Sequence, residues 1–143
     1  MTDPRSNYAA VLKKAALDTN LKLDKALQAT AVETIGRMID RTPVDTGAAK
    51  YHWFVRAQPT EIFDKSRTDP SGQQPKSRAK RDVKQMRIGF MLWLVNSAPY
   101  MTYLERGSSK QAPAGVVAIT LVEVPVLWRR EVHASWGHAA KAL

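Results

Sequence analysis

The chain has 143 residues, enough for one domain that buries roughly two-thirds of its unfolded surface without help from metals or disulfides. It contains no cysteine, which excludes disulfide frameworks, thiolate zinc sites and thiol catalysis, and which suits assembly in a reducing cytoplasm. With 22 Lys and Arg against 13 Asp and Glu, its net charge of +9 indicates an acidic partner, whether a protein surface, a nucleic acid or lipid headgroups.

Apolar runs are short throughout the chain. The longest, residues 90–95 and 116–122, fall far below the ~20 residues that span a bilayer. The first seven residues are polar and no apolar segment follows them, so no secretory signal is visible. We therefore expect a soluble protein without a membrane partner.

The first predicted element is a long helix. Apolar residues recur at helical intervals from Tyr8 and, after a polar step, continue as a stripe to Ile39. A helix over residues 13–41 would be about 43 Å long, and it either continues through the step or breaks near Thr19. Pro43 ends it, because the residue before a proline is pushed out of the helical region.

Residues 42–47, Thr-Pro-Val-Asp-Thr-Gly, have turn chemistry. Pro43 fixes φ, Asp45 can accept hydrogen bonds from nearby backbone N–H groups, and Gly47 can take a positive φ. Apolar and aromatic side chains then alternate with a period of two over residues 50–57, which predicts a strand. We expect one face of this strand to meet the long helix and the other to meet a partner.

A long polar segment follows. Residues 58–82 hold three prolines and few large apolar residues, and such a connection is far longer than the usual ~4–6 residues, so we expect a mobile arm. Residues 83–95 predict a second strand, antiparallel to the first, which makes the arm part of a hairpin. Residues 65–87 contain eight basic and two acidic residues, and therefore hold +6 of the net charge. The basic residues are Lys65, Arg67, Lys76, Arg78, Lys80, Arg81, Lys84 and Arg87.

The basic segment supports three interpretations. It can neutralise phosphates, in which case binding would weaken steeply with salt; it can dock on an acidic protein surface; or it can be a solvated loop. No aromatic residue is interleaved within residues 65–87 for stacking on bases, so the composition favours docking on protein.

Residues 96–107 predict a short helical turn after the second strand. Pro99 suits the first helical position, where its missing N–H needs no partner, and Gly107 closes the turn. Tyr100 lies on the face that packs, while Glu105 points elsewhere.

Residues 116–136 are ambiguous. Their β-branched residues favour a strand, whereas the spacing of Val117, Leu121 and Trp128 fits a helix, and length favours the helix. Pro125 would kink that helix by removing one backbone hydrogen bond.

The sequence contains no recognisable catalytic site. His133 and His138 are five residues apart, a poor match for two metal ligands on one helical face, and no carboxylate completes a site. Asp45 and Glu105 fit turn and helix-surface roles better than a pair of catalytic acids. The Gly-x-Ser-x-Gly elbow, the Walker loop and the dinucleotide glycine fingerprint are all absent from the sequence. We expect no enzyme activity, no cofactor and no metal.

Taken together, these patterns predict a single α+β domain over residues 1–143. It has a long N-terminal helix packed on a small antiparallel β-sheet with a long basic hairpin arm, a short helix after the second strand and a C-terminal helix. The mobile basic arm, residues 58–82, lies within that domain.

The order of these parts resembles the tail-completion, or neck, proteins of long-tailed double-stranded DNA bacteriophages, a group that includes minor tail protein Z-like tail components. The resemblance covers roughly residues 23–124. The motifs that carry it are Thr-Pro-Val-Asp-Thr-Gly at 42–47, Asn-Ser-Ala-Pro-Tyr at 96–100, Leu-Glu-Arg-Gly at 104–107 and Ala-Pro-Ala-Gly at 112–115.

This resemblance implies a structural virion protein without catalytic residues. Copies would form a homo-oligomeric ring, a hexamer, which is assembled in the host cytoplasm and becomes part of the virion at the neck. The ring would complete the tail and join it to the head, with a tail terminator or tail tube protein on one side and a head connector or stopper protein on the other. DNA would pass through without specific binding.

The resemblance also implies roles for individual residues. The structural turns would be formed by Pro43, Asp45, Gly47, Pro99 and Gly107. Tyr100 would lie near a subunit boundary, and Glu105 would meet a basic residue of a neighbouring subunit. The basic residues between 65 and 87 would contact a neighbouring subunit or an acidic head or tail protein, and their arm would become ordered on binding.

Two other classes compete with this interpretation. One is a basic, non-catalytic nucleic-acid-binding protein with its arm on the phosphate backbone, which salt-sensitive binding to random duplex would favour. The other is a small nuclease-like or toxin-like enzyme, which would lose its support if the protein were inactive on DNA and RNA with divalent metals.

Overall fold

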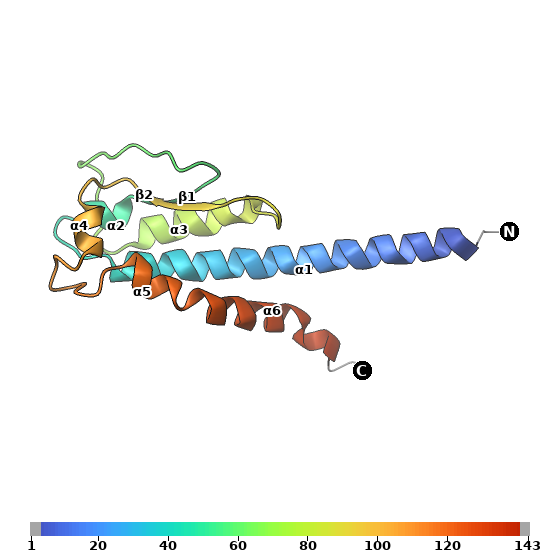
Figure 1. The fold of residues 1–143 in the computed structure, drawn as a ribbon. Coiled ribbons are helices and arrows are strands. Elements are labelled where there is room, and N and C mark those ends of the chain that lie inside the picture. Colours follow the sequence, from blue (N-terminus) through green and yellow to red (C-terminus); the bar gives the residue numbers. More distant parts are fainter. Residues whose placement is uncertain (1–3, 141–143) are drawn as a thin grey trace.

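The computed structural model describes residues 4–140. A long N-terminal helix, a two-stranded antiparallel sheet and C-terminal helices make up the fold, so the predicted α+β class is confirmed (Figure 1). Trp53 of the first strand lies opposite Asn96 of the second, and Arg56 lies opposite Trp93. The elements in chain order are α1 (Pro4–Arg41), α2 (Ala48–Tyr51), β1 (Trp53–Arg56), α3 (Gln73–Asp82), the 3₁₀ turn η1 (Val83–Gln85), β2 (Trp93–Asn96), α4 (Met101–Glu105), α5 (Val117–Leu121) and α6 (Val124–Ala140).

Helix α1 is a single 38-residue helix, about 57 Å long. It passes through Thr19 without a break, because the polar step there contains no proline or glycine to interrupt the backbone hydrogen bonds. It ends where predicted, since Thr42 still donates its N–H to the carbonyl oxygen of Met38 and Pro43 then stops the helix.

The second half of α1 is the centre of the molecule. Figure 1 shows it between two layers, with α3 and the sheet on one side and α5 and α6 on the other. Ile35 and Ile39 are almost fully buried in the core, together with Trp53 and Val55 of β1 and Val116 before α5. Burial of these side chains is what holds the layers together.

Both predicted strands are longer than the strands of the structure. Residues 50–57 are a strand only from Trp53 onward, because Tyr51 and His52 donate their N–H groups to the carbonyls of Gly47 and Ala48 and so complete a helical turn. The prediction is wrong for residues 83–92.

Two features interrupt the predicted strand in residues 83–92. Val83–Gln85 is a 3₁₀ turn, and Gly89 takes a φ of 92°, which reverses the chain before Trp93. Only Trp93–Asn96 pairs with β1. Met86 is buried, whereas Phe90, four residues later and so on the same face of a regular strand, is 79% exposed.

The expected hairpin arm is also replaced by a different structure. Its second part, residues 73–82, is helix α3, and both Pro75 and Ala79 are buried as the helix packs on α1 and β1. Pro75 lies in the first turn, where its missing N–H is tolerated. The buried Asp69 fixes the helix start, because it accepts hydrogen bonds from the Ser71 hydroxyl at 2.6 Å and from the backbone N–H of Gln74 at 2.8 Å.

The C-terminal region consists of two helices rather than one kinked helix. The break falls between α5 and α6, at Val122 and Glu123. Pro125 is the second residue of α6 and so lies in a first turn, where no intrahelical hydrogen bond is lost.

Candidate functional site

The turn at residues 42–47 and the segment 96–107 meet in space. They form two walls of one groove of about 620 Å³, although the α2, β1, α3 and β2 elements separate them in the chain. Its lining includes Pro43, Asp45 and Gly47 from the first segment and Pro99, Tyr100 and Leu104 from the second.

Glycine is required at one position in each of the two segments. Gly47 has a φ of 90° and Gly107 a φ of 83°, in the region that L side chains rarely adopt. A Cβ atom on Gly47 would overlap the backbone nitrogen of Pro70, and one on Gly107 would overlap the carbonyl oxygen of Pro113. Both turns therefore have a fixed backbone.

Side chains link residues that line the groove to one another and to the sheet. Gln111 forms a two-way hydrogen bond with Val44, donating to its carbonyl at 3.0 Å and accepting from its N–H at 2.9 Å. Asn96 donates from Nδ2 to the Ala49 carbonyl at 2.8 Å. The rings of Phe63 and Tyr100 meet edge to face, with 6.0 Å between their centroids.

Helix α4 begins later than the sequence predicts. Its first residue is Met101, so Pro99 is not at the first helical position; it lies exposed in the preceding turn. Asn96 causes the delay, because its Oδ1 accepts the N–H of Ala98 at 2.9 Å and Met101 then donates to the Ala98 carbonyl. Gly107 follows the helix and closes it, as predicted.

The groove has few charged groups. Pro43 is buried and Asp45 is exposed at one wall, with Lys65 also contributing to the lining. Tyr100 is 37% exposed, and its partial burial raises the pKa of its hydroxyl.

Glu105 acts within the chain. Its Oε2 accepts the backbone N–H groups of Val116 and Val117 at 2.9 and 2.7 Å, and its Oε1 accepts that of Ala118 at 2.8 Å. Burial raises the pKa of Glu105, but the three hydrogen bonds outweigh that effect and bring the pKa below its ordinary value. Glu105 thus caps α5, in place of the predicted contact with a neighbour's basic residue.

The eight basic residues of the segment 65–87 have separate roles. Arg78 is partly buried, donates from its guanidinium to the carbonyls of Tyr51 and Trp53 at 2.5 and 3.0 Å, and lies 3.9 Å from the Phe54 ring centroid. Burial lowers the pKa of Arg78, and its Nε has no hydrogen-bond partner. Arg78 therefore fastens α3 to β1 and is not available to a partner.

Three further members form ion pairs within the chain. Lys76 binds Asp40 of α1 at 2.5 Å, and Arg81 lies 3.2 Å from Asp82. Arg87 donates to the Met86 carbonyl at 2.8 Å and lies 3.8 Å from Asp24. Of these three, Arg81 and Arg87 keep most of their side chains exposed.

The remaining four, Lys65, Arg67, Lys80 and Lys84, are exposed. Lys80 and Lys84 line a shallow hollow with Lys25 of α1, where Glu131 of α6 is also present. Lys65 and Arg67 lie in the irregular segment before α3. Hydrogen bonds from Ser66 lower the pKa of the Asp64 carboxyl, and the nearby charge of Arg67 lowers it further. The eight basic residues thus come from different parts of the chain: the segment before α3, α3 itself, η1 and the loop after it.

The histidine side chains that the structure describes have no metal-binding arrangement. His52 is buried, with Nδ1 2.7 Å from the Ala48 carbonyl, and its Nε2 accepts the N–H of Asp64 at 3.1 Å, so it is a packing histidine. His133 is exposed, while the side chain of His138 lies outside the described residues. Within residues 4–140, no group of three or more possible ligands is present.

A three-residue cluster that the sequence analysis missed connects α1 to the α5–α6 junction. Glu123 accepts from Arg37 at 2.9 Å and from Arg41 at 2.6 Å. Hydrogen bonds from Arg41 and Arg37 lower the pKa of Glu123 to about 2. No pattern could have signalled it, because 82 and 86 residues separate the partners.

No family model matches the chain, and neither the curated proteins nor the solved structures compared with it include a match. Within the described residues, the structure contains no helix that is both long and apolar enough to cross a membrane.

Proposed function

We propose that the chain is a structural virion protein of a bacteriophage neck, which completes the tail and joins it to the head connector as part of a homo-oligomeric ring. One observation carries most of the support. Two segments that carry motifs of the resemblance, residues 42–47 and 96–107, line one groove, and Gly47 and Gly107 fix their backbones. A shared fold would bring such separated motifs together.

The distribution of charge supports a protein partner. The exposed side chains of Lys65, Arg67, Lys80 and Lys84 are spread over the segment before α3, over α3 and over η1. A tail terminator, tail tube, connector or stopper protein with acidic side chains at matching points would complement them. DNA passing through the ring would then meet no dense row of phosphate contacts.

Loss of the protein during phage assembly tests the proposal. Phage grown without it should give DNA-filled heads and separate tails in electron micrographs, and supply of the wild-type chain from a plasmid should restore joined particles. Normal particles without the protein would refute the joining role.

A second candidate is a non-catalytic nucleic-acid-binding protein, because Lys25, Lys80 and Lys84 border one hollow. It predicts a gel shift of random duplex that disappears as salt rises, and that weakens in a Lys80→Glu/Lys84→Glu variant. The exposed Lys110→Glu change is a matched control that should have less effect. Absence of any shift at low salt would remove this candidate.

A further inference from the structure

The first half of α1, residues 5–21, is exposed to solvent, and we call it the bare half. Figure 1 shows the helix extending past both layers, and every side chain described from Arg5 to Leu21 is exposed. Several are large and apolar: Tyr8 is 73% exposed, Leu12 69% and Leu21 58%. Such residues are normally covered when they lie in a periodic pattern on a helix.

One bare face continues the side of α1 that α5 and α6 cover. Lys22 lies over the Trp136 ring of α6 at 5.8 Å, and Arg37 binds Glu123, so these two residues mark the covered side. At 3.6 residues per turn, Tyr8, Val11, Leu12 and Ala15 project around the same direction. We call these four residues the stripe.

The other bare face continues the side that the sheet layer covers. Asp24 accepts the N–H of Ile88 at 2.6 Å and Gln28 donates to the Met86 carbonyl at 3.0 Å, which places the loop before β2 against them. Leu21 precedes Asp24 by three residues and Leu17 precedes Leu21 by four, so these two leucines continue this face beyond the loop.

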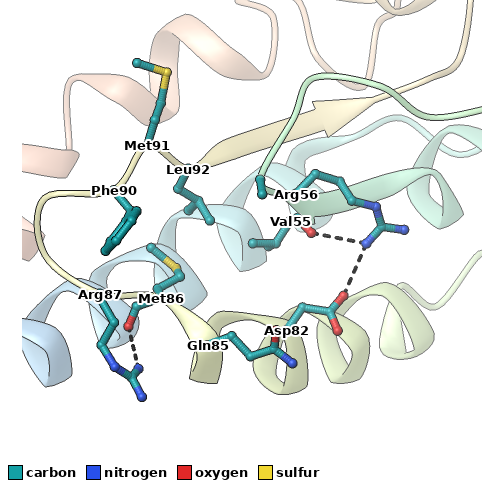
Figure 2. Close-up of a pocket in the computed structure, with 10 residues that line it drawn as sticks. Val55, Arg56, Asp82, Gln85, Met86, Arg87, Phe90, Met91 and Leu92 are labelled. Carbon is teal, nitrogen blue, oxygen red and sulfur yellow. Dashed lines mark hydrogen bonds and ion pairs between the residues drawn. The ribbon is translucent and has the colours of Figure 1, made fainter.

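The loop itself presents apolar groups on the same face of α1, and it meets the helix at Asp24, one turn from Leu21. Ile88, Phe90 and Met91 are exposed, and Figure 2 shows Phe90 and Leu92 beside Met86 in a hollow of about 430 Å³. Methionine side chains adapt readily to an inserted group. We call the five exposed residues the corner: Leu17, Leu21, Ile88, Phe90 and Met91.

The surface area of the chain exceeds that of a compact monomer, which leaves area available for contacts with other chains. A compact monomer of 16.0 kDa has about 7,400 Å² of accessible surface. This chain has 9831 Å², an excess of about 2,400 Å², whereas one standard interface takes about 800 Å² from each partner. The excess is enough for more than one interface per chain.

Further copies of the same chain can cover both faces. The stripe and the corner lie on nearly opposite sides of the same helix, so contact between them joins copies head to tail and leaves one stripe and one corner free for the next copy. We propose that the stripe of one copy packs into the corner of the next. This specifies an interface for the ring in the proposed function, and it can be tested without phage.

Cross-linking tests the contact directly, because the chain has no cysteine of its own. Oxidation of a Val11→Cys/Phe90→Cys variant should give a ladder of disulfide-linked multimers. The matched Ala9→Cys/Phe90→Cys control should not, since Ala9 is exposed but projects about 160° away from Val11. Equal ladders in both variants, or none in either, would overturn the proposal.

Mixing tests the head-to-tail geometry. Val11→Glu and Phe90→Glu should each lower the solution mass from that of the wild-type multimer to that of a monomer, whereas Ala9→Glu should not. A mixture of the two monomeric variants should form one-to-one dimers, because one supplies an intact stripe and the other an intact corner. A mixture that stays monomeric, or a wild-type chain that is monomeric at every concentration, would refute the interface.

The two proposals can fail separately. Phage that lack the protein could still show unjoined heads and tails while the purified chain fails both association tests. That result would overturn the stripe and corner contact and leave the joining role in place.

Discussion

The two halves of α1 have the same secondary structure and opposite surroundings. Residues 22–41 lie between two layers, with Ile39 wholly buried, whereas residues 5–21 are exposed throughout the described side chains. Both halves have good helix formers such as Ala, Leu and Lys. Helical conformation is therefore set locally, while burial against the two layers decides which half of α1 contributes to the stability of the fold.

Truncation of a core residue should give the largest difference between the halves. Ile39→Ala removes a side chain with no exposure and should lower the free energy of unfolding by about 2–5 kcal/mol. Leu17→Ala, in the bare half, should change it by less than about 0.5 kcal/mol. Urea unfolding at a concentration where the chain is monomeric measures both, and similar losses would contradict the comparison.

A smaller loss should follow removal of the cap on α5, one of the elements that cover the second half. Glu105→Ala leaves the N–H groups of Val116 and Val117 without their acceptor and should lower stability by about 1–3 kcal/mol. Glu131→Ala, which breaks only an ion pair with Arg130, should lower it by at most about 1 kcal/mol. Equal thermal shifts would argue against the capping role.

Acid should lower the free energy of unfolding by weakening the ion pairs of the covered half of α1. The pKa of Glu123 is lowered from 4.5 to about 2, so its bonds to Arg37 and Arg41 stabilise the fold above pH 4.5, and this contribution is lost as the pH falls towards 2. Wild type should therefore be more stable than Glu123→Gln at neutral pH, and the difference should shrink through this range. Denaturant titrations across pH give the curve, and a constant difference would exclude Glu123 as its source.

The smallest global effect should come from glycine in the bare half. Ala10→Gly should weaken the local helix by about 1 kcal/mol and speed amide exchange around it, without moving the global unfolding midpoint. Ala29→Gly, in the covered half, should lower global stability by about the same amount. A shift of the midpoint by Ala10→Gly would show that the bare half is coupled to the core.

Local patterns were sufficient for much of the fold. Helical periodicity predicted α1, a period of two with aromatic residues predicted a strand around Trp53, and Gly107 marked the end of α4. These signals act between residues a few positions apart, where backbone geometry alone fixes the outcome. They failed where that geometry was overridden, as at Gly89, whose positive φ ends an otherwise regular alternation.

The candidate site was predicted only in part. The turns at residues 42–47 and 96–107 were identified, but nothing in the sequence indicated that they face each other across one groove. Glu105 and Arg78 were expected to contact partners, and both instead satisfy backbone groups of the chain itself. Their acceptors and donors lie 11 to 27 residues away, beyond the reach of any local pattern.

The sequence by itself determined the α+β class, the C-terminal end of α1 and the presence of turns at residues 42–47 and 96–107, because propensity, proline and positive φ act over a few residues. Only the tertiary structure decided that α3 is a packed helix, that Glu123 joins α1 to α6 and that half of α1 is bare. Burial and long-range hydrogen bonds set those outcomes, and both depend on which distant segments become neighbours.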